Sequence, residues 1–145
     1  MRAAPALTPA LPLSRLLLVE ADPAVSAALQ RGLRRAAWDV LWAPNGSAAL
    51  RLKPIFVPDV VLLSLDLPDM DGGALVRLLA QQGDCAVVAL SGRGEAARTA
   101  TMDGGAHDYL TKPAAMRDIL ARLQAVARHL SPALANEAAA LLCPA

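Results

Sequence analysis

The chain has 145 residues, of which 55% are hydrophobic and only 3% aromatic, and its formal net charge is +1. This length suits one domain, which buries enough apolar surface to need no metal or disulfide for stability. The two cysteines, Cys85 and Cys143, form no CxxC motif, which is typical of reduced thiols in a cytoplasmic protein. Without a block of like charge, the sequence favours neither a nucleic-acid-binding nor a membrane-binding protein.

The two ends of the chain differ from its middle. Prolines interrupt the apolar residues 1–14, so we expect a disordered lead-in there and no signal peptide. No apolar run approaches the roughly 20 residues that a membrane helix needs, and a cytoplasmic location follows. Residues 131–145 are rich in helix formers and predict a C-terminal helix or linker stub. The sequence is compatible with three roles for this segment: a docking helix, a dimer contact and a link to an output domain.

Residues 15–130 alternate between short apolar runs and helical patterns. The apolar runs predict buried strands at residues 16–19, 40–43, 60–63, 86–90 and 109–110. Apolar residues at helical spacing predict helices over residues 23–37, 75–79, 95–102 and 114–130. A further short helix is expected between the Asn45-Gly46 turn and Pro54, which ends it, and residues 67–73 are expected to form a loop. Strands that are apolar on both faces and alternate with helices predict a parallel sheet covered on both sides.

The carboxyl ends of these strands are the expected place for a functional site. In doubly wound α/β proteins, ligands bind in the crevice outside the carboxyl ends of the strands. Glu20, Ser64, Ser91 and Lys112 stand at those ends. The topology alone therefore selects one acid, two hydroxyls and one lysine as candidate site residues.

Four segments in this order resemble the receiver domains of two-component signalling. They are LLLVEAD at residues 16–22, PDVVLLSLDLPDMDG at 58–72, VALSGRG at 88–94 and DYLTKP at 108–113. The resemblance covers about residues 15–130. It implies an α/β, flavodoxin-like, doubly wound (βα)5 fold with a five-stranded parallel sheet in the order 2-1-3-4-5.

The resemblance also assigns roles to single residues. In the family, an aspartate after the third strand accepts a phosphoryl group, and counting back from Pro68 and from Gly72 places Ser64 at this position. The family's acidic pair falls on Glu20 and Ala21. The remaining matches are Ser91 and Tyr109 as switch residues, Lys112 as the phosphate-pairing lysine, and Pro113 as a cis-proline.

Ser64 and Ala21 stand where the family has acidic residues, and these two differences change the expected chemistry. A serine hydroxyl needs a nearby base to become a nucleophile, so we expect no aspartyl phosphate. Ser64 has two interpretations: a small hydroxyl bonded to its neighbours, or a modified serine. Only Glu20 and Asp66 remain as weak metal candidates, so Mg²⁺ binding is doubtful and no cofactor is expected. We expect Lys112 to pair with Glu20, or with Asp66 if that side chain turns inward.

The resulting hypothesis is a receiver-like module of a two-component or phosphorelay system that is not an enzyme. It would bind a partner protein, namely a histidine kinase, an output domain or a second copy, through its fourth helix, fifth strand and fifth helix. Alternatives are a receiver still phosphorylated on Asp66 or Glu20, and a small-molecule-sensing pseudo-receiver. A nucleotide- or flavin-using enzyme is disfavoured, because the first turn has no GxGxxG or Walker glycines.

Overall fold

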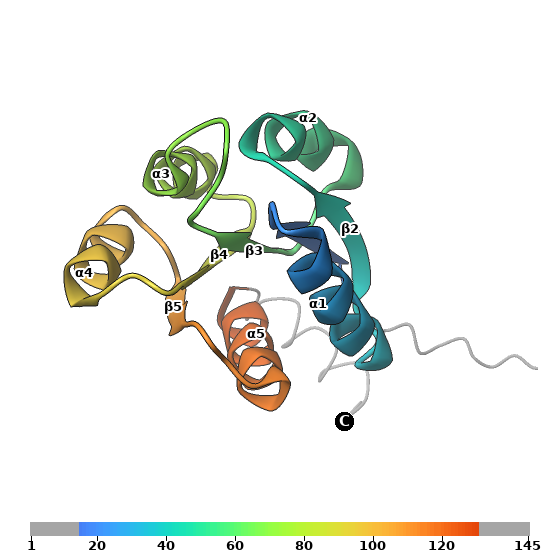
Figure 1. Cartoon of the computed structure of the whole chain (residues 1–145). Helices are drawn as coiled ribbons and strands as arrows, with labels where there is room; N and C mark the ends of the chain where they lie inside the picture. The colour runs from blue at the N-terminus through green and yellow to red at the C-terminus, as the bar shows by residue number, and fades with distance from the viewer. Residues whose placement is uncertain (1–14, 131–145) are drawn as a thin grey trace, which may run out of the picture.

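The computed structural model describes residues 15–130, which form one parallel sheet with helices on both faces (Figure 1). The strands are β1 (Arg15–Val19), β2 (Asp39–Ala43), β3 (Val60–Ser64), β4 (Ala86–Ser91) and β5 (Asp108–Thr111). Their order in the sheet is β2-β1-β3-β4-β5, so the predicted fold is confirmed. The expected N-terminal lead-in and the C-terminal helix or linker stub lie outside the described residues.

Five helices follow the strands. They are α1 (Pro23–Arg35), α2 (Gly46–Phe56), α3 (Gly72–Gln82), α4 (Glu95–Asp103) and α5 (Met116–Leu130). In Figure 1, α1 and α5 cover one face of the sheet, while α2, α3 and α4 lie on the other. Among the described residues, no helix is long and apolar enough to cross a bilayer.

Each strand sends alternate side chains into two separate cores, because successive residues of a strand point to opposite faces. In β1, Leu16 and Leu18 join the core beneath α1 and α5, and Leu17 and Val19 join the core on the opposite face. All five residues of β3 are buried. Burial on both faces explains why the strands appear in the sequence as unbroken apolar runs.

Side-chain caps fix where three of the helices begin. Asp22 accepts hydrogen bonds from the backbone N–H groups of Ala24 and Val25, with Pro23 at the first helical position. Asn45 caps α2 and Asp71 caps α3 in the same way. A capping side chain satisfies an N–H group that has no partner within the helix. These caps anchor the loops that leave the carboxyl ends of the first three strands.

The second helix is longer than predicted. We expected Pro54 to end it, but α2 continues to Phe56 with Pro54 inside. Pro54 lies in the last turn, where its missing N–H costs only one helical hydrogen bond. The helix ends instead at Val57, which adopts a left-handed conformation and donates its N–H to the Lys53 carbonyl.

Candidate functional site

The four polar side chains expected at the strand ends do lie at one edge of the sheet. Glu20, Ser64 and Ser91 are buried, and the Lys112 side chain is 30% exposed. The strands are parallel and in register, with Ser64 paired to Leu90 and Ser91 paired to Thr111. This register brings residues from distant parts of the chain to the same edge.

Lys112 is the centre of this cluster. Its ammonium donates a hydrogen bond to Ser64 Oγ at 2.8 Å and forms an ion pair with Glu20 Oε1 at 3.4 Å. The second carboxylate oxygen of Glu20 accepts the backbone N–H of Asp22 at 3.0 Å. The expected pairing of Lys112 with Glu20 is therefore present.

The contact between Lys112 and Ser64 does not make the serine a nucleophile. The ammonium has three donors and no acceptor, so in this geometry it donates to the hydroxyl and removes no proton from it. Ser64 is 2% exposed, and the side chain that bonds its hydroxyl is the Lys112 ammonium, which is not a base. The arrangement favours Ser64 as a hydroxyl that holds Lys112 in place.

Asp66 lies outside this cluster. Its carboxylate accepts hydrogen bonds from the Arg93 guanidinium, the shorter at 2.8 Å, and its side chain is 63% exposed. Leu65, the residue before it, is buried in the core, which turns Asp66 toward solvent. The expectation that Asp66 joins Glu20 in an acidic pocket, or pairs with Lys112, is not met.

The two expected switch residues meet at Arg93. Ser91 Oγ accepts the backbone N–H of Arg93 at 3.0 Å. Tyr109, only 1% exposed, lies inside the domain and directs its hydroxyl to the Arg93 carbonyl at 3.4 Å. The Arg98 guanidinium lies 5.5 Å from the centre of the Tyr109 ring, within the range of a cation–π contact.

Arg93 is the site residue that the sequence did not single out. Its side chain pairs with the loop after β3, and its backbone contacts Ser91 and Tyr109, the two expected switch residues. The one sequence signal is its position, two residues after Ser91. This signal is weak, because an arginine in a surface loop is usually solvated.

The carboxylates at this edge do not fit a magnesium ion. Of Glu20, Asp22 and Asp66, only Glu20 faces the cluster, since Asp22 caps α1 and Asp66 pairs with Arg93. Within residues 15–130, no three His, Cys, Asp or Glu side chains come together as a metal site would require. Magnesium needs near-octahedral oxygen ligands, and this donor set does not supply them.

The loop after β3 is tied to α2. Asp69 accepts the backbone N–H groups of Gly46 and Ser47 at 2.9 and 2.8 Å, and these bonds hold the pKa of Asp69 below its ordinary value. Asp69 therefore joins two neighbouring loops, because the positive end of the α2 dipole attracts a carboxylate.

Cys85 is not a second reactive centre. It is 1% exposed, and burial raises the pKa of its thiol to about 11. A thiolate is the nucleophilic form of cysteine, and burial keeps this thiol protonated at neutral pH. Cys143 lies outside the described residues.

Parallel strands in this order, with a lysine, two hydroxyls and one acid at their carboxyl ends, define a flavodoxin-like α/β domain with a polar site at the sheet edge. Residues 16–124 match the family model of the response regulator receiver domain. The chain therefore belongs to the response regulator receiver family.

Curated relatives and solved structures agree with this assignment. The transcriptional regulatory protein PrrA of Mycobacterium tuberculosis is 38% identical over 116 residues, 79% of this chain and 50% of PrrA. The response regulator MprA of Mycobacterium sp. is 38% identical over 120 residues, 81% of this chain and 52% of MprA. The chain thus spans about half the length of these relatives.

Two solved receiver structures are similar in shape. The BeF3-activated receiver domain of Klebsiella pneumoniae RstA has a TM-score of 0.76 at 31% identity, covering 79% of this chain and 99% of that one. A CheY-like receiver domain protein from Methanospirillum hungatei has a TM-score of 0.77 at 22% identity, covering 83% of this chain and 98% of that one. The second likeness concerns the fold alone.

Proposed function

We propose that this receiver domain transmits its signal through protein–protein contacts and without forming an aspartyl phosphate. The observation that carries the proposal is the contact between Lys112 and Ser64. The family places a carboxylate at the end of β3, and this chain has a hydroxyl there, already bonded to the lysine. A hydroxyl phosphorylated at this position would be a stable ester and not a labile acyl phosphate.

The surroundings of Ser64 support this proposal. The ion pair with Glu20 balances the charge of Lys112 without a phosphate or a cation. Asp66, the nearest alternative acceptor, is turned outward and held by Arg93. The domain in this proposal is a signalling module and not an enzyme, since it has neither the acid nor the metal ligands for phosphoryl transfer.

The network at Arg93 indicates how the domain could work without phosphate. In the family, the switch hydroxyl and the aromatic of β5 move inward upon phosphorylation. Here Ser91 and Tyr109 are both buried and both bonded to Arg93. We infer that the Asp66–Arg93 pair holds the loop after β4 in this arrangement.

The proposed contact surface consists of α4, β5 and α5. This surface includes Arg98 on the ring of Tyr109 and an ion pair between Arg122 and Asp108 at 2.9 Å. Met102 of α4 is a large apolar side chain that is 38% exposed. A histidine kinase, an output domain or a second copy of the domain would bind there, and nucleic acid would not.

Association measurements test this proposal. We expect acetyl phosphate with Mg²⁺ to leave the association state unchanged in sedimentation velocity, alone and with a candidate partner. The matched control is the double variant Ala21→Asp/Ser64→Asp, which supplies the two missing carboxylates and should respond to acetyl phosphate. A wild-type response that Asp66→Asn or Glu20→Gln removes would support phosphorylation of that acid and contradict the proposal.

A further inference from the structure

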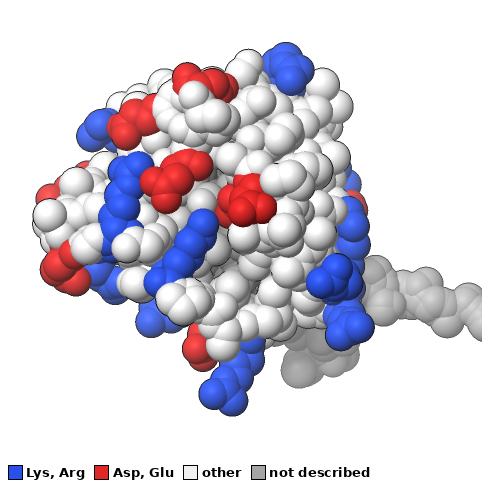
Figure 2. Space-filling view, in the orientation of Figure 1, with Lys and Arg blue, Asp and Glu red and all other residues white. Residues whose placement is uncertain are grey.

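Charge is distributed unevenly over the domain. The helices α1 and α5 carry six arginines and one acid, whereas the rest of residues 15–130 carries seven basic and eleven acidic residues. The near-neutral total therefore combines two basic helices with a surplus of acids in the rest of the described domain. Figure 2 shows blue side chains over the lower part of α1, without red atoms between them.

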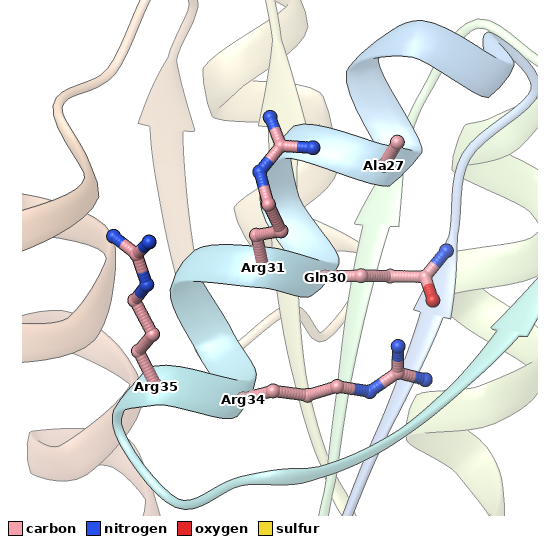
Figure 3. A pocket seen from close by; sticks show the side chains of 5 residues that line it. All are labelled: Ala27, Gln30, Arg31, Arg34 and Arg35. Atoms are coloured by element: carbon pink, nitrogen blue, oxygen red, sulfur yellow. The ribbon is translucent and has the colours of Figure 1, made fainter.

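The more basic of these two helices is α1, and its arginines lie on its outer face. Arg31, Arg34 and Arg35 are exposed there, and together with Ala27 and Gln30 they line a shallow hollow of about 530 Å³. In Figure 3, Arg31 and Arg35 extend to one side of the helix, and Gln30 and Arg34 to the other. Ala27 lies one helical turn before Arg31, and its small side chain leaves space beside that of Arg31.

These arginines have no acidic partner among the described residues. Five lysines or arginines elsewhere form ion pairs, and Arg31, Arg34 and Arg35 form none. The helix α1 itself contains no acid. Arg34 donates to the Val40 carbonyl at 3.1 Å, which leaves its charge unbalanced.

Helix stability alone does not explain this arrangement. Arg34 and Arg35 stand in the last turn, where a cation interacts favourably with the helix dipole. Arg31 is outside that turn. It is four residues from Arg35, a spacing at which like charges destabilise a helix.

We propose that the outer face of α1 binds an acidic segment of a partner protein, with its carboxylates against Arg31, Arg34 and Arg35. A guanidinium pairs with a carboxylate through two parallel hydrogen bonds, and the open hollow admits a peptide backbone. This surface is separate from the α4–β5–α5 surface and independent of the chemistry at Ser64.

An acidic peptide fits this face better than a nucleic acid does. Proteins that bind nucleic acid usually carry a strongly basic domain, and the net charge here is +1. The surplus of acids outside α1 and α5 would repel a long phosphate chain. A short acidic segment needs to contact only the outer face of α1, a helix that contains no acid.

Fluorescence anisotropy with a labelled oligoglutamate peptide tests this proposal. The test variant is Arg31→Glu/Arg35→Glu, which leaves Arg34 and its bond to Val40 intact. The control is Arg51→Glu/Arg77→Glu, which makes the same change in charge at exposed positions on α2 and α3. Thermal melts establish that both variants fold.

We expect wild type to bind the peptide, and binding to weaken when salt rises to about 0.15 M, because salt screens exposed charges. The test variant should bind at least about tenfold more weakly, and the control within about twofold of wild type. Equal losses in both variants, or no binding by wild type, would overturn the proposal. Oligothymidylate that binds as tightly and depends on the same arginines would also overturn it, in favour of a general polyanion site.

Discussion

Lys112 at the end of β5 donates a hydrogen bond to Ser64 at the end of β3, over 2.8 Å and across the intervening strand β4. The same ammonium forms an ion pair with the buried carboxylate of Glu20. Ser64 and Glu20 thus both contact the same ammonium group. This cluster is the basis of the function proposed for the domain.

The first prediction concerns the energy of this cluster. Lys112→Met should lower the free energy of unfolding by about 2 kcal/mol, because it leaves a buried carboxylate without its cation. The loss stays below that of a fully buried pair, since the Lys112 side chain is 30% exposed. Urea denaturation measures the change.

A double-mutant cycle with Glu20→Gln isolates the interaction. The double variant should be less destabilised than the sum of the single variants by about 1 kcal/mol. Strict additivity would show that Glu20 and Lys112 do not stabilise each other.

The second prediction concerns Arg93. Asp66→Asn should increase hydrogen exchange at the backbone N–H of Arg93, because the side chain that restrains the loop after β4 loses its partner. Global stability should fall by less than about 1 kcal/mol, since the pair is exposed. Hydrogen exchange measured by NMR, with Asp103→Asn as an exposed control, tests this role. Unchanged exchange at Arg93 would mean that the pair does not restrain the loop.

The third prediction compares two adjacent glycines. A Cβ on Gly72 would clash with the backbone carbonyl oxygen of Leu65, whereas on Gly73 the nearest atom is an Asp71 carboxylate oxygen at 3.3 Å. Gly72→Ala should therefore cost about 1–3 kcal/mol, because the backbone must move. Gly73→Ala should be neutral or stabilise α3 by up to about 1 kcal/mol, because alanine loses less conformational freedom on folding. Equal melting temperatures of the two variants would contradict this account.

The fourth prediction concerns pH. Lys53 is buried and its ammonium contacts Asp84 at 2.7 Å, and this hydrogen bond holds the pKa of Asp84 below its ordinary value of 3.8. A lowered pKa stabilises the folded state above the ordinary value and loses that effect as pH falls through the lowered value. Asp84→Asn should thus reduce stability at pH 7 by about 1 kcal/mol or less, since the Asp84 side chain is 65% exposed.

The measurement is urea denaturation of wild type and Asp84→Asn between pH 7 and strongly acidic pH. The difference between the two proteins should shrink as Asp84 becomes protonated. A difference that grows toward acidic pH would contradict the assigned direction.

The sequence predicted most of the fold because the strands are buried on both faces. Continuous apolar runs such as residues 60–63 mark such strands directly, and caps such as Asp22 mark where helices begin. Pro54 misled the prediction, because a proline in the last turn of a helix removes only one hydrogen bond. A single residue's local preference did not decide where α2 ends.

The candidate site was only partly predictable. Topology placed Glu20, Ser64 and Lys112 together, because parallel strands end at the same edge. The direction in which Asp66 points could not be read from the sequence, since it depends on the burial of Leu65 and on the reach of Arg93. Long-range partners of exposed charged side chains leave no pattern along the chain.

The absence of an acyl phosphate is tested most directly by intact-mass spectrometry after incubation with acetyl phosphate and Mg²⁺. The account predicts that wild type gains no phosphoryl group that hydroxylamine or mild base removes, while Ala21→Asp/Ser64→Asp gains one. A labile adduct of one phosphoryl group on wild type, mapped to Asp66 or Glu20, would contradict it.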